Sequence, residues 1–337
     1  MQQLRTLYLK KREDRRIRAG HLWIFSNEID VSRQALTDFA PGEAVEIRDA
    51  QGAKLGEGYV NPSSLIAVRL LTRGGIAPSA HLQETEALQG SQLGQKNKSS
   101  NAADLVRERL KRALTLRERL FDVPYYRLCH SEGDFLPGLI VDRYGNILSV
   151  QFNTAGMEAL REPILDALQE LLRPSVIALR NDTASRALEG LPQYVECVEG
   201  SMPENVEVVE NGARFAAPFA PDKGGQKTGW FYDQRVNRLT AGRFAGETAL
   251  DAFSYAGGFG CMAALNGAKH VAFMDASASA LDAARENLRR NAPGAEAECL
   301  KGDALTLLES LRDEGRRFSL VCLDPPAFIK RKKDAAA

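Results

Sequence analysis

The sequence predicts a multidomain α/β protein in which two small domains precede a doubly wound parallel sheet. Three observations predict it. The chain has 337 residues, enough for two or three domains of roughly 150 residues each. Apolar and polar residues alternate near the N-terminus as they do in strands. From about residue 230 onwards, helix-like segments alternate with strand-like segments.

Composition and charge exclude several classes of protein. Hydrophobic residues make up 44% of the chain, and 44 Lys and Arg balance 44 Asp and Glu, which excludes a disordered protein. No apolar run approaches the roughly 20 residues of a membrane span, and the start lacks a signal-peptide core. The five cysteines form neither CxxC pairs nor a disulfide framework. We therefore expect a reduced, cytoplasmic protein with no membrane segment and no metal site.

Charge is distributed unevenly along the chain. The segment 1–128 carries a net charge of +6, and the segment 129–337 carries −6. Basic residues cluster near the N-terminus, at Lys10, Lys11, Arg12, Arg15, Arg16 and Arg18. A polyanion would bind there, although a solvated basic face explains the same cluster and is favoured by charge alone.

The first two domains are predicted from strand and turn signals. Residues 1–78 are expected to be β-rich, with strand-like runs at 7–11, 23–25 and 65–72 and a hairpin over 42–60 that turns at 49–52. Residues 79–121 should be a polar linker followed by an amphipathic helix over 104–121. Residues 122–215 should be a small α+β domain, with a hairpin around 143–146, a helix over 157–172, a strand over 176–180 and a second hairpin that turns at 211–212.

Residues 216–337 carry the helix–strand alternation of a parallel sheet. Strands are expected over 247–253, 270–277, 297–303 and 318–326, and helices over 236–244, 261–267, 279–291 and 304–315.

Acidic residues stand at the ends of these four strands, at Asp251, Asp275, Asp303 and Asp324. Ligands of such sheets bind beyond the carboxyl ends of the strands. The glycines of 257–260 (GGFG) would let a ligand approach the backbone closely. The interval from Asp251 to Asp275 is that of a second-strand carboxylate that binds a ribose diol.

A nicotinamide-binding domain and a methyltransferase compete at this point. The former would carry G-x-G-x-x-G around a pyrophosphate, whereas no third glycine follows here, and Asp251 would repel a pyrophosphate. Asp251 suits a cationic group instead, such as the amino group of S-adenosylmethionine. Residues 324–328 (DPPAF) favour the methyltransferase, because the prolines hold the Asp324 carboxylate and Phe328 can stack on an extruded base. A proline-terminated strand with a core phenylalanine is the structural alternative.

With these motifs the chain resembles the bacterial class I S-adenosylmethionine-dependent 23S ribosomal RNA (cytosine-5) methyltransferases. The resemblance covers nearly the whole chain and rests on 224–238 (GGQKTGWFYDQRVNR), 251–260 (DAFSYAGGFG), 274–277 (MDAS), 301–304 (KGDA) and 324–328. It implies a PUA-like RNA-binding domain over 1–78, the middle α+β domain and a Rossmann-like methyltransferase domain over 216–337. S-adenosylmethionine would be the cofactor and large-subunit (23S) ribosomal RNA the partner.

The resemblance also implies roles for individual residues. The substrate-side catalytic loop would be Asp324, Pro325 and Phe328. The cofactor would be bound by Lys227, Thr228, Gly229, Gln234, Asp251, Phe253, Tyr255, Gly257, Gly258, Asp275 and Asp303. Asp233 and Arg235 belong either to that set or to a structural ion pair that anchors their segment. Lys10, Lys11, Arg12, Arg15 and Arg16 are the RNA-binding candidates.

Two departures from the family pattern affect the expected activity. Methylation of cytosine C5 requires a cysteine thiolate that adds to C6, yet position 327 is Ala, and Cys261 and Cys322 read as packing residues. Only the short stretch 325–337 follows Asp324, whereas a complete sheet needs three more strands. We therefore expect a chain truncated after the fourth strand, inactive as it stands, with an unpaired and aggregation-prone sheet edge.

The leading functional hypothesis is thus a ribosomal RNA methyltransferase that makes 5-methylcytosine in 23S RNA. Two alternatives stay open. One is an RNA N-methyltransferase acting on an exocyclic amine, which needs no cysteine. The other is a non-catalytic RNA-binding relic of the same fold.

Overall fold

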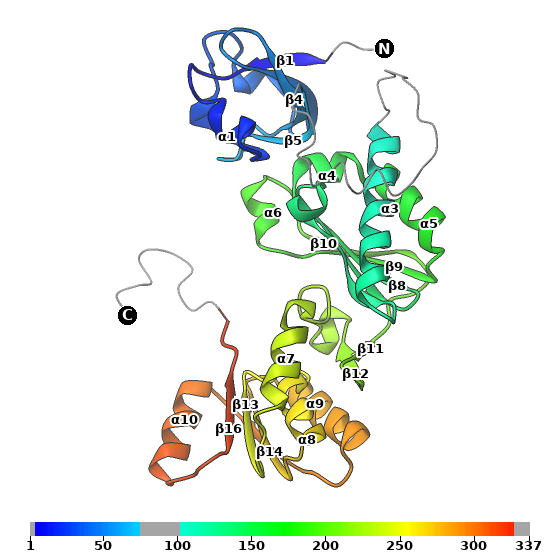
Figure 1. The fold of residues 1–337 in the computed structure, drawn as a ribbon, viewed down its shortest axis with the longest axis vertical. Helices are drawn as coiled ribbons and strands as arrows, with labels where there is room; N and C mark the ends of the chain where they lie inside the picture. Colours follow the sequence, from blue (N-terminus) through cyan, green and yellow to red (C-terminus); the bar gives the residue numbers. More distant parts are fainter. Residues whose placement is uncertain (1–3, 75–101, 327–337) are drawn as a thin grey trace. The chain divides into compact units, whose positions relative to one another are not determined.

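A computed structural model describes residues 4–74 and 102–326 (Figure 1). The chain divides into two compact units, which are described separately. The first comprises residues 1–120, 127–142 and 150–199, and the second comprises 121–126, 143–149 and 200–337. The division into four segments expected from the sequence stays a prediction. Within the described part, no helix is both long enough and apolar enough to cross a membrane.

The first unit begins with a five-stranded sheet of order β1-β3-β4-β5-β2. β1 runs parallel to β3, and the other pairs are antiparallel. The strands are β1 (Arg5–Tyr8), β2 (Trp23–Ile24), β3 (Glu43–Arg48), β4 (Lys54–Val60) and β5 (Val68–Arg73), joined by the helices α1 (Arg15–Arg18), η1 (Ser26–Glu28) and η2 (Leu36–Asp38).

Local hydrogen bonds and the burial of alternate residues explain the strands of this sheet. The predicted β3–β4 hairpin forms because Asp49 Oδ1 accepts hydrogen bonds from the backbone N–H groups of Gln51 and Ala53, over 3.0 and 2.8 Å. Alternate residues of β3, Val45 and Ile47, enter a shared apolar core. The prediction for the first strand was wrong at its end, because Arg12 has a φ of 75° and the chain has already left the sheet.

The second layer of the first unit is a five-stranded sheet of order β10-β9-β8-β7-β6, to which β6–β8 contribute residues of both units. Its elements are α3 (Ala102–Leu120), β6 (Tyr125–His130), η3 (Ser131–Asp134), β7 (Leu139–Tyr144), β8 (Ile147–Phe152), α4 (Ala155–Ala159), α5 (Arg161–Leu172), β9 (Val176–Asn181), α6 (Ser185–Leu188) and β10 (Tyr194–Glu199). The β7–β8 hairpin, the α3 helix and the β9 strand are confirmed.

The sequence-based prediction for this layer was wrong in two respects. The helix expected over 157–172 is two helices, because Pro163 has no N–H and therefore sits in the first turn of a new helix, α5. The strands β6 and β10 were missed. Both are edge strands of the sheet, and their polar residues hide the alternation that a buried strand would show.

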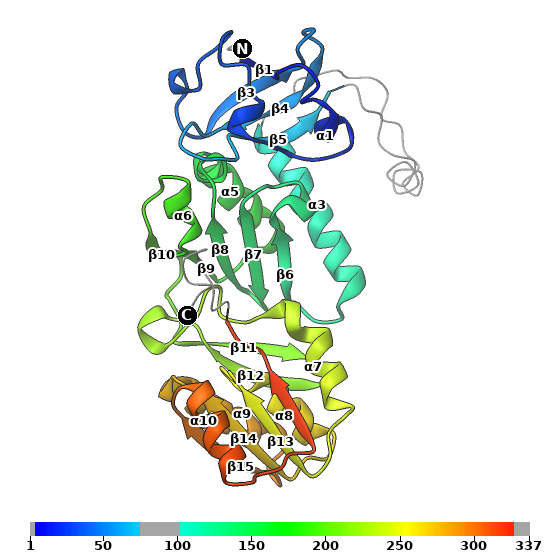
Figure 2. The ribbon, with the colours of Figure 1, turned by 90° about the vertical axis from the view of Figure 1, so that its left-hand side faces the viewer.

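The second unit contains a two-stranded hairpin and a four-stranded parallel sheet of order β15-β14-β13-β16 (Figure 2). Its elements are β11 (Asn205–Glu210), β12 (Ala213–Pro218), η4 (Pro221–Lys223), η5 (Tyr232–Gln234), α7 (Arg235–Gly242), β13 (Thr248–Ala252), α8 (Gly258–Leu265), β14 (His270–Asp275), α9 (Ala278–Asn291), β15 (Glu296–Lys301), α10 (Ala304–Asp313) and β16 (Leu320–Leu323). The predicted alternation and the parallel, doubly wound sheet are confirmed.

Successive side chains of β13 contact different helices, which shows which face of the sheet each helix covers. Leu250 and Ala252 share a core with Ala304 and Leu311 of α10. The intervening residue Asp251 accepts a hydrogen bond from Gly260 of α8 instead. Because successive side chains of a strand point to opposite faces, α10 and α8 cover opposite faces of the sheet.

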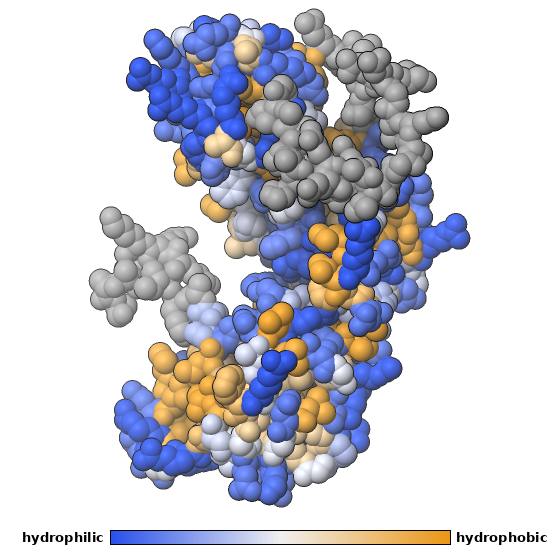
Figure 3. All heavy atoms as spheres, in the orientation of Figure 1, coloured by the Kyte–Doolittle hydropathy of each residue, from blue (hydrophilic) through white to orange (hydrophobic). Residues whose placement is uncertain are grey.

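Among the strands of the described residues, β16 forms one edge of this sheet and pairs with β13. Two of its side chains are half exposed, Val321 at 49% and Leu323 at 56%. Figure 3 shows hydrophobic side chains gathered over β16 and α10, where Leu305 is also exposed. This patch is the largest apolar feature that the figure shows on the second unit.

Candidate functional site

The carboxyl ends of three strands meet at one edge of the parallel sheet. Ala252 is paired with Met274 on one side and with Leu323 on the other. Asp275 and Asp324 come directly after these partners, and Asp251 lies one residue before Ala252. Three of the four predicted acids are therefore neighbours.

Asp251 is the buried member of this group. It is only 2% exposed, and its Oδ2 accepts a hydrogen bond of 2.8 Å from the N–H of Gly260. The pKa of Asp251 is raised to about 7, chiefly by burial and in small part by the carboxylates of Asp324 and Asp275, against the lowering effects of the Gly260 hydrogen bond and the charge of Arg238. Asp251 is thus a carboxyl poised to respond to a cationic ligand.

The fourth acid, Asp303, has a different local role. Its Oδ1 accepts hydrogen bonds from the N–H and the hydroxyl of Thr306, over 3.0 and 3.1 Å, and so caps the N-terminus of α10. These bonds lower the pKa of Asp303. Its placement beside an adenine stays a prediction.

The loop after β13 holds an unusual backbone. Phe253, Tyr255 and Gly257 have φ values of 61°, 46° and 78°, in a region that side chains rarely adopt. The N–H of Tyr255 donates to Asp275 Oδ2 over 2.9 Å, and its hydroxyl lies 2.9 Å from the carbonyl oxygens of Pro218 and Gly229. Strained backbone held by so many partners is typical of ligand-binding loops.

The glycines of this loop are required by close packing. A Cβ on Gly257 would lie 2.8 Å from the Cβ of Ala284, and one on Gly258 would lie 2.6 Å from Cδ of Arg238. The hydroxyl of Ser254 is buried with no hydrogen-bond partner among the described residues. An orphaned hydroxyl in the loop that leads to the N-terminus of α8 fits a ligand that brings both donors and acceptors, as S-adenosylmethionine does.

The segment 224–238 lies against the same edge of the sheet. Gln234 Nε2 donates to Asp324 Oδ1 over 3.4 Å. Thr228 is buried and its carbonyl accepts from the hydroxyl of Tyr144 over 3.0 Å. Lys227 has a φ of 48° and its ammonium stands 4.9 Å above the ring of Phe231. The structure therefore brings this predicted segment to Asp324, while its contact with a cofactor stays a prediction.

A buried carboxylate that the sequence analysis missed anchors this segment. The side chain of Glu210 is fully buried and accepts hydrogen bonds from Arg238 Nε at 2.6 Å, Trp230 Nε1 at 3.1 Å and Arg235 Nε at 3.3 Å. Arg238 also donates to the carbonyl of Phe231 over 2.9 Å. Arg235 thus belongs to a structural ion pair, but its partner is Glu210 and not Asp233.

A sequence signal for Glu210 existed. Val206, Val208 and Glu210 occupy alternate positions of β11 and are all buried, so the alternation that marks a buried face continues into a charged residue. A glutamate at such a position requires a cationic partner nearby. Arg235 and Arg238 supply it from one face of α7, three residues apart.

The substrate-side loop is described in part. Asp324, Pro325 and Pro326 are exposed at the end of β16. Burial raises the pKa of Asp324, and the charge of Asp233 raises it further. Phe328 lies outside the described residues, as do residues 79–101 of the linker expected over 79–103.

The thiol groups are all held in the protonated form. Burial raises the pKa of Cys322 to about 12, with a contribution from the charge of Asp251, and raises that of Cys261 as well. Burial likewise raises the pKa values of Cys129, Cys197 and Cys299. A nucleophilic cysteine needs a lowered pKa, so these values support reading Cys261 and Cys322 as packing residues.

The N-terminal basic cluster divides into paired and unpaired members. Arg16 pairs with Glu28 at 3.0 Å, and the ammonium of Lys10 donates to the carbonyl of Asn27 over 2.8 Å. Lys11, Arg12 and Arg15 are exposed and form no ion pair within the described ranges. These three are the members available to an anion.

Asp251 should make cofactor binding depend on pH. Its pKa is raised in the folded protein, so ionisation costs stability: the cost is absent below pH 3.8, grows as pH rises, and is complete above about pH 7. A cationic cofactor binds the ionised form, so its affinity should rise several-fold from pH 6 to pH 8. Asp251→Asn should flatten this rise, weaken binding and raise the melting temperature of the free protein above pH 7. Titration calorimetry across this range checks it.

The control is Asp282→Asn, which removes an exposed carboxylate on α9 that pairs with Arg285. Its pH profile should match the wild type. An affinity that stays flat with pH in the wild type would contradict the prediction.

Asp275→Ala should weaken cofactor binding by about 1.5–3 kcal/mol, the usual worth of hydrogen bonds to a charged group. The carboxylate also accepts from the N–H groups of Tyr255 and Ser277, each over 2.9 Å, so its loss frees the strained loop. Asp275→Asn keeps one acceptor and should restore part of the affinity. Calorimetry with S-adenosylmethionine measures both, and an unchanged affinity in the alanine variant would show that the ligand lies elsewhere.

Comparisons with known proteins agree with this geometry. Residues 7–73 match the model of a PUA-like domain, and residues 189–333 match the model of an S-adenosylmethionine-dependent methyltransferase. The fold is similar to that of a solved structure from Streptococcus mutans described as a SAM-dependent methyltransferase (TM-score 0.73, 16% identity, 96% of this chain and 77% of that one). It is also similar to a methyltransferase crystallised with SAH (TM-score 0.75, 17% identity, 98% and 78%).

Curated relatives extend the likeness to the sequence. A ribosomal RNA large subunit methyltransferase I from Tolumonas auensis is 34% identical over 334 residues, which cover 97% of this chain and 77% of the relative. Its counterpart from Aliivibrio fischeri is 35% identical over 331 residues, with the same coverage of 97% and 77%. The cofactor and enzyme class expected from the motifs are thereby confirmed. The chain belongs to the ribosomal RNA large subunit methyltransferase I family, and it combines a PUA-like domain with an S-adenosylmethionine-dependent methyltransferase domain.

Proposed function

We propose that this protein methylates the RNA of the large ribosomal subunit in the cytoplasm, and that its product is 5-methylcytosine in 23S RNA. The observation that carries the proposal is the convergence of Asp251, Asp275 and Asp324 at one sheet edge, in a chain of this family. The family's names support the ribosomal substrate, and the resemblance of DPPAF to the base-binding loops of nucleic-acid methyltransferases supports methylation at a base.

In this proposal, different residues of the chain bind the cofactor and the base. The cofactor supplies an electrophilic methyl group on a sulfonium. Asp275 would hold its ribose, while Asp251 and the N–H groups at the start of α8 would hold its polar head. Gln234 would fix the Asp324 carboxylate, which faces the base. The glycine loop, held by Tyr255, would exclude water from the methyl group.

An N-methyltransferase activity on an exocyclic amine is the second candidate. It is favoured by the raised thiol pKa values, because cytosine C5 needs a thiolate whereas an amine does not. Asp324 ends the strand beside these thiols and can accept a hydrogen bond from such an amine.

Transfer of labelled methyl groups tests the proposal. The substrate is 23S RNA, protein-free or in the large subunit, and the protein is this chain beside a version extended to the length of the relatives. Transfer by either chain would support the proposal. Mass spectrometry of the nucleosides distinguishes 5-methylcytosine from an N-methylated base. Absence of transfer by both chains, with S-adenosylmethionine bound, would leave a non-catalytic RNA-binding protein and would overturn the proposal.

The basic cluster should contribute to RNA affinity through counterion release. Reversing the charges of Lys10, Lys11 and Arg12 to Glu should lower the affinity and flatten its dependence on salt, because each lost phosphate contact releases one counterion fewer. Electrophoretic titrations at several salt concentrations measure the slope. The same reversal at Lys269, Arg289 and Arg312, exposed in the second unit, is the control. An identical slope in both variants would place the RNA platform elsewhere.

A further inference from the structure

A cavity of about 420 Å³ opens on the surface of the first unit, between strand β2 and the turn η3. It is lined by Gly20, His21, Leu22, Trp23, Arg73, Glu132 and Phe135. None of the cofactor residues and none of the RNA-binding candidates named above belongs to it. Its wall combines an aromatic face with one carboxylate, one imidazole and one guanidinium.

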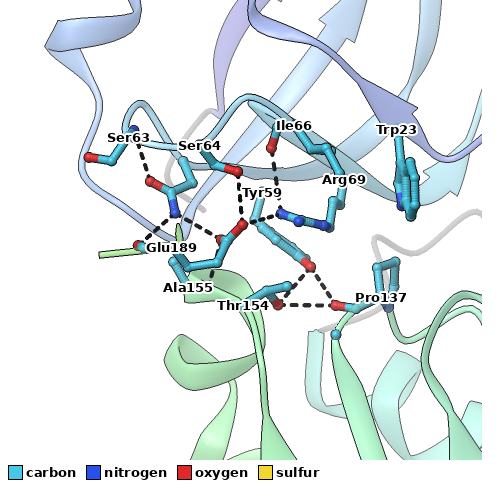
Figure 4. Close-up of polar contacts among 12 residues, drawn as sticks. Trp23, Tyr59, Ser63, Ser64, Ile66, Arg69, Pro137, Thr154, Ala155 and Glu189 are labelled. Atoms are coloured by element: carbon cyan, nitrogen blue, oxygen red, sulfur yellow. Dashed lines mark hydrogen bonds and ion pairs between the residues drawn. The ribbon is translucent and has the colours of Figure 1, made fainter. Parts of the chain in front are cut away.

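Trp23 forms the aromatic wall of this cavity. The side chain is 37% exposed, whereas the next residue of β2, Ile24, is fully buried. Its indole N–H donates to Glu132 Oε1 over 2.7 Å, and the hydroxyl of Ser131 donates to Oε2. Figure 4 shows Trp23 on the side of the PUA-like sheet, beside Arg69. The ring is therefore held in position at its edge while part of its surface stays open.

Glu132 retains capacity for a ligand. A carboxylate has about four lone-pair sites, and the two hydrogen bonds from Trp23 and Ser131 use one on each oxygen. The remaining sites can accept from an amino group that lies in the plane of a base stacked beside Trp23. Carboxylates accept from the exocyclic amine of cytosine in this way.

The opposite wall is strained and firmly held. Ser131 and Phe135, at the two ends of η3, have φ values of 50° and 60° although neither is glycine. Arg117 grips Asp134 of this turn with two hydrogen bonds, of 2.5 and 2.7 Å. The guanidinium of Arg109 donates to the carbonyls of Phe135 and Leu71 and so ties the turn to β5. A strained turn with this support keeps its shape before any ligand arrives.

Positive charge leads into the cavity. Helix α1 ends at Arg18, and the N–H of His21 donates to the carbonyl of Arg16 over 3.0 Å. The unpaired cations Lys11, Arg12 and Arg15 do not line the cavity, but they precede its wall residues Gly20–Trp23 by a few positions in the chain. Arg73 completes the wall from β5, where its guanidinium donates to the carbonyl of Gly20. This charge fits a phosphate backbone that runs along α1 to the cavity.

We propose that the cavity binds one unpaired nucleotide of the RNA, with its base stacked on Trp23, an amino group of the base bonded to Glu132, and a phosphate beside Arg73 and His21. The inference rests on the proposed function, since it takes the substrate to be RNA. It assigns a holding site for a nucleotide other than the one methylated, because none of the strand-end carboxylates lines the cavity. Cytosine, adenine and guanine bear an exocyclic amine and should bind better than uracil.

Tryptophan fluorescence tests the proposal with the intact chain and short single-stranded RNA. The chain has two tryptophans, and Trp230 is buried, so quenching on titration with hexacytidylate should come from Trp23. Base–aromatic stacking predicts that Trp23→Ala loses roughly 5- to 100-fold in affinity, measured by anisotropy of a labelled hexamer. Glu132→Gln should reduce the preference for hexacytidylate over hexauridylate to near unity while leaving hexauridylate affinity unchanged.

The matched control is Leu65→Ala, which removes an apolar side chain that is 80% exposed on the same unit, and it should bind as the wild type does. Melting curves establish that all variants are folded. Unchanged hexamer affinity in Trp23→Ala, or absence of quenching in the wild type, would overturn the proposal. Methyl transfer to 23S RNA fails or succeeds separately, so a failure of this site remains distinguishable from a failure of the proposed function.

Discussion

Glu210→Ala is expected to destabilise the second unit by about 3–5 kcal/mol, because it leaves two buried arginines without their counter-charge. Arg238 and Arg235 both donate to this carboxylate, as does the indole N–H of Trp230. All three belong to the segment that reaches Asp324, so cofactor affinity should fall along with stability. Chemical denaturation measures the first effect and calorimetry with S-adenosylmethionine the second.

A variant of a neighbouring glutamate serves as the control, because it removes the same charge from an exposed position. Glu207 lies on the same strand, is exposed, and pairs loosely with Arg214 at 3.5 Å. Glu207→Ala should cost no more than about 1 kcal/mol, as exposed pairs do. Equal losses in the two variants would mean that Glu210 does not anchor the segment.

Glu189→Ala is expected to have a comparable effect, about 3–5 kcal/mol, in the first unit. Its buried carboxylate accepts from Arg69 at 2.9 Å, from Asn61 Nδ2 at 2.8 Å and from the hydroxyl of Ser64 at 2.9 Å (Figure 4). These three donors come from the PUA-like sheet, whereas Glu189 follows α6 of the other layer. The alanine variant leaves the buried guanidinium of Arg69 unpaired and should loosen the joint between the two layers.

Hydrogen exchange of the amides of β4 and β5 reads out this loosening, since exchange reports local opening. The control is Glu196→Ala on β10, whose exposed carboxylate pairs with Arg161 at 2.9 Å. A variant at Glu189 that keeps both its denaturation midpoint and its exchange pattern would show that the other contacts of the joint, such as the hydrogen bonds from Tyr59 to Pro137 and from Trp23 to Glu132, hold it without Glu189.

The parts of the fold that the sequence could predict are those in which hydrophobic residues recur at a regular spacing. The central strands β13 and β14 of the second unit are buried runs, and burial on both faces leaves only one assignment for them. The edge strands β15 and β16 are partly exposed, and they also appear where expected because they continue the alternation with helices. The strands β6 and β10 have one side without a partner, so their sequences carry the mixed pattern of an edge. Leu160 breaks a predicted helix for a local reason, the proline three residues later.

The candidate site could likewise be predicted only in part. Asp251, Asp275 and Asp324 could be predicted together, since strand ends in a parallel sheet share an edge. Glu210 and Glu189 could not be paired from the sequence, because their partners Arg238 and Arg69 lie on other elements, far from them along the chain. Ion pairs of this kind depend on tertiary packing, which no local pattern encodes.

The prolines after β16 limit how far its open edge extends. Edge strands present unpaired N–H and C=O groups that can template the growth of fibrils. Pro325 and Pro326 have no N–H group, so the hydrogen-bonding run stops at Asp324, whose charge repels a like-charged copy of itself. The residues that we propose to hold the base therefore also act as gatekeepers for a strand that exposes Val321 and Leu323. A substitution that removes one of these prolines is therefore expected to affect the solubility of the described chain as well as the position of Asp324.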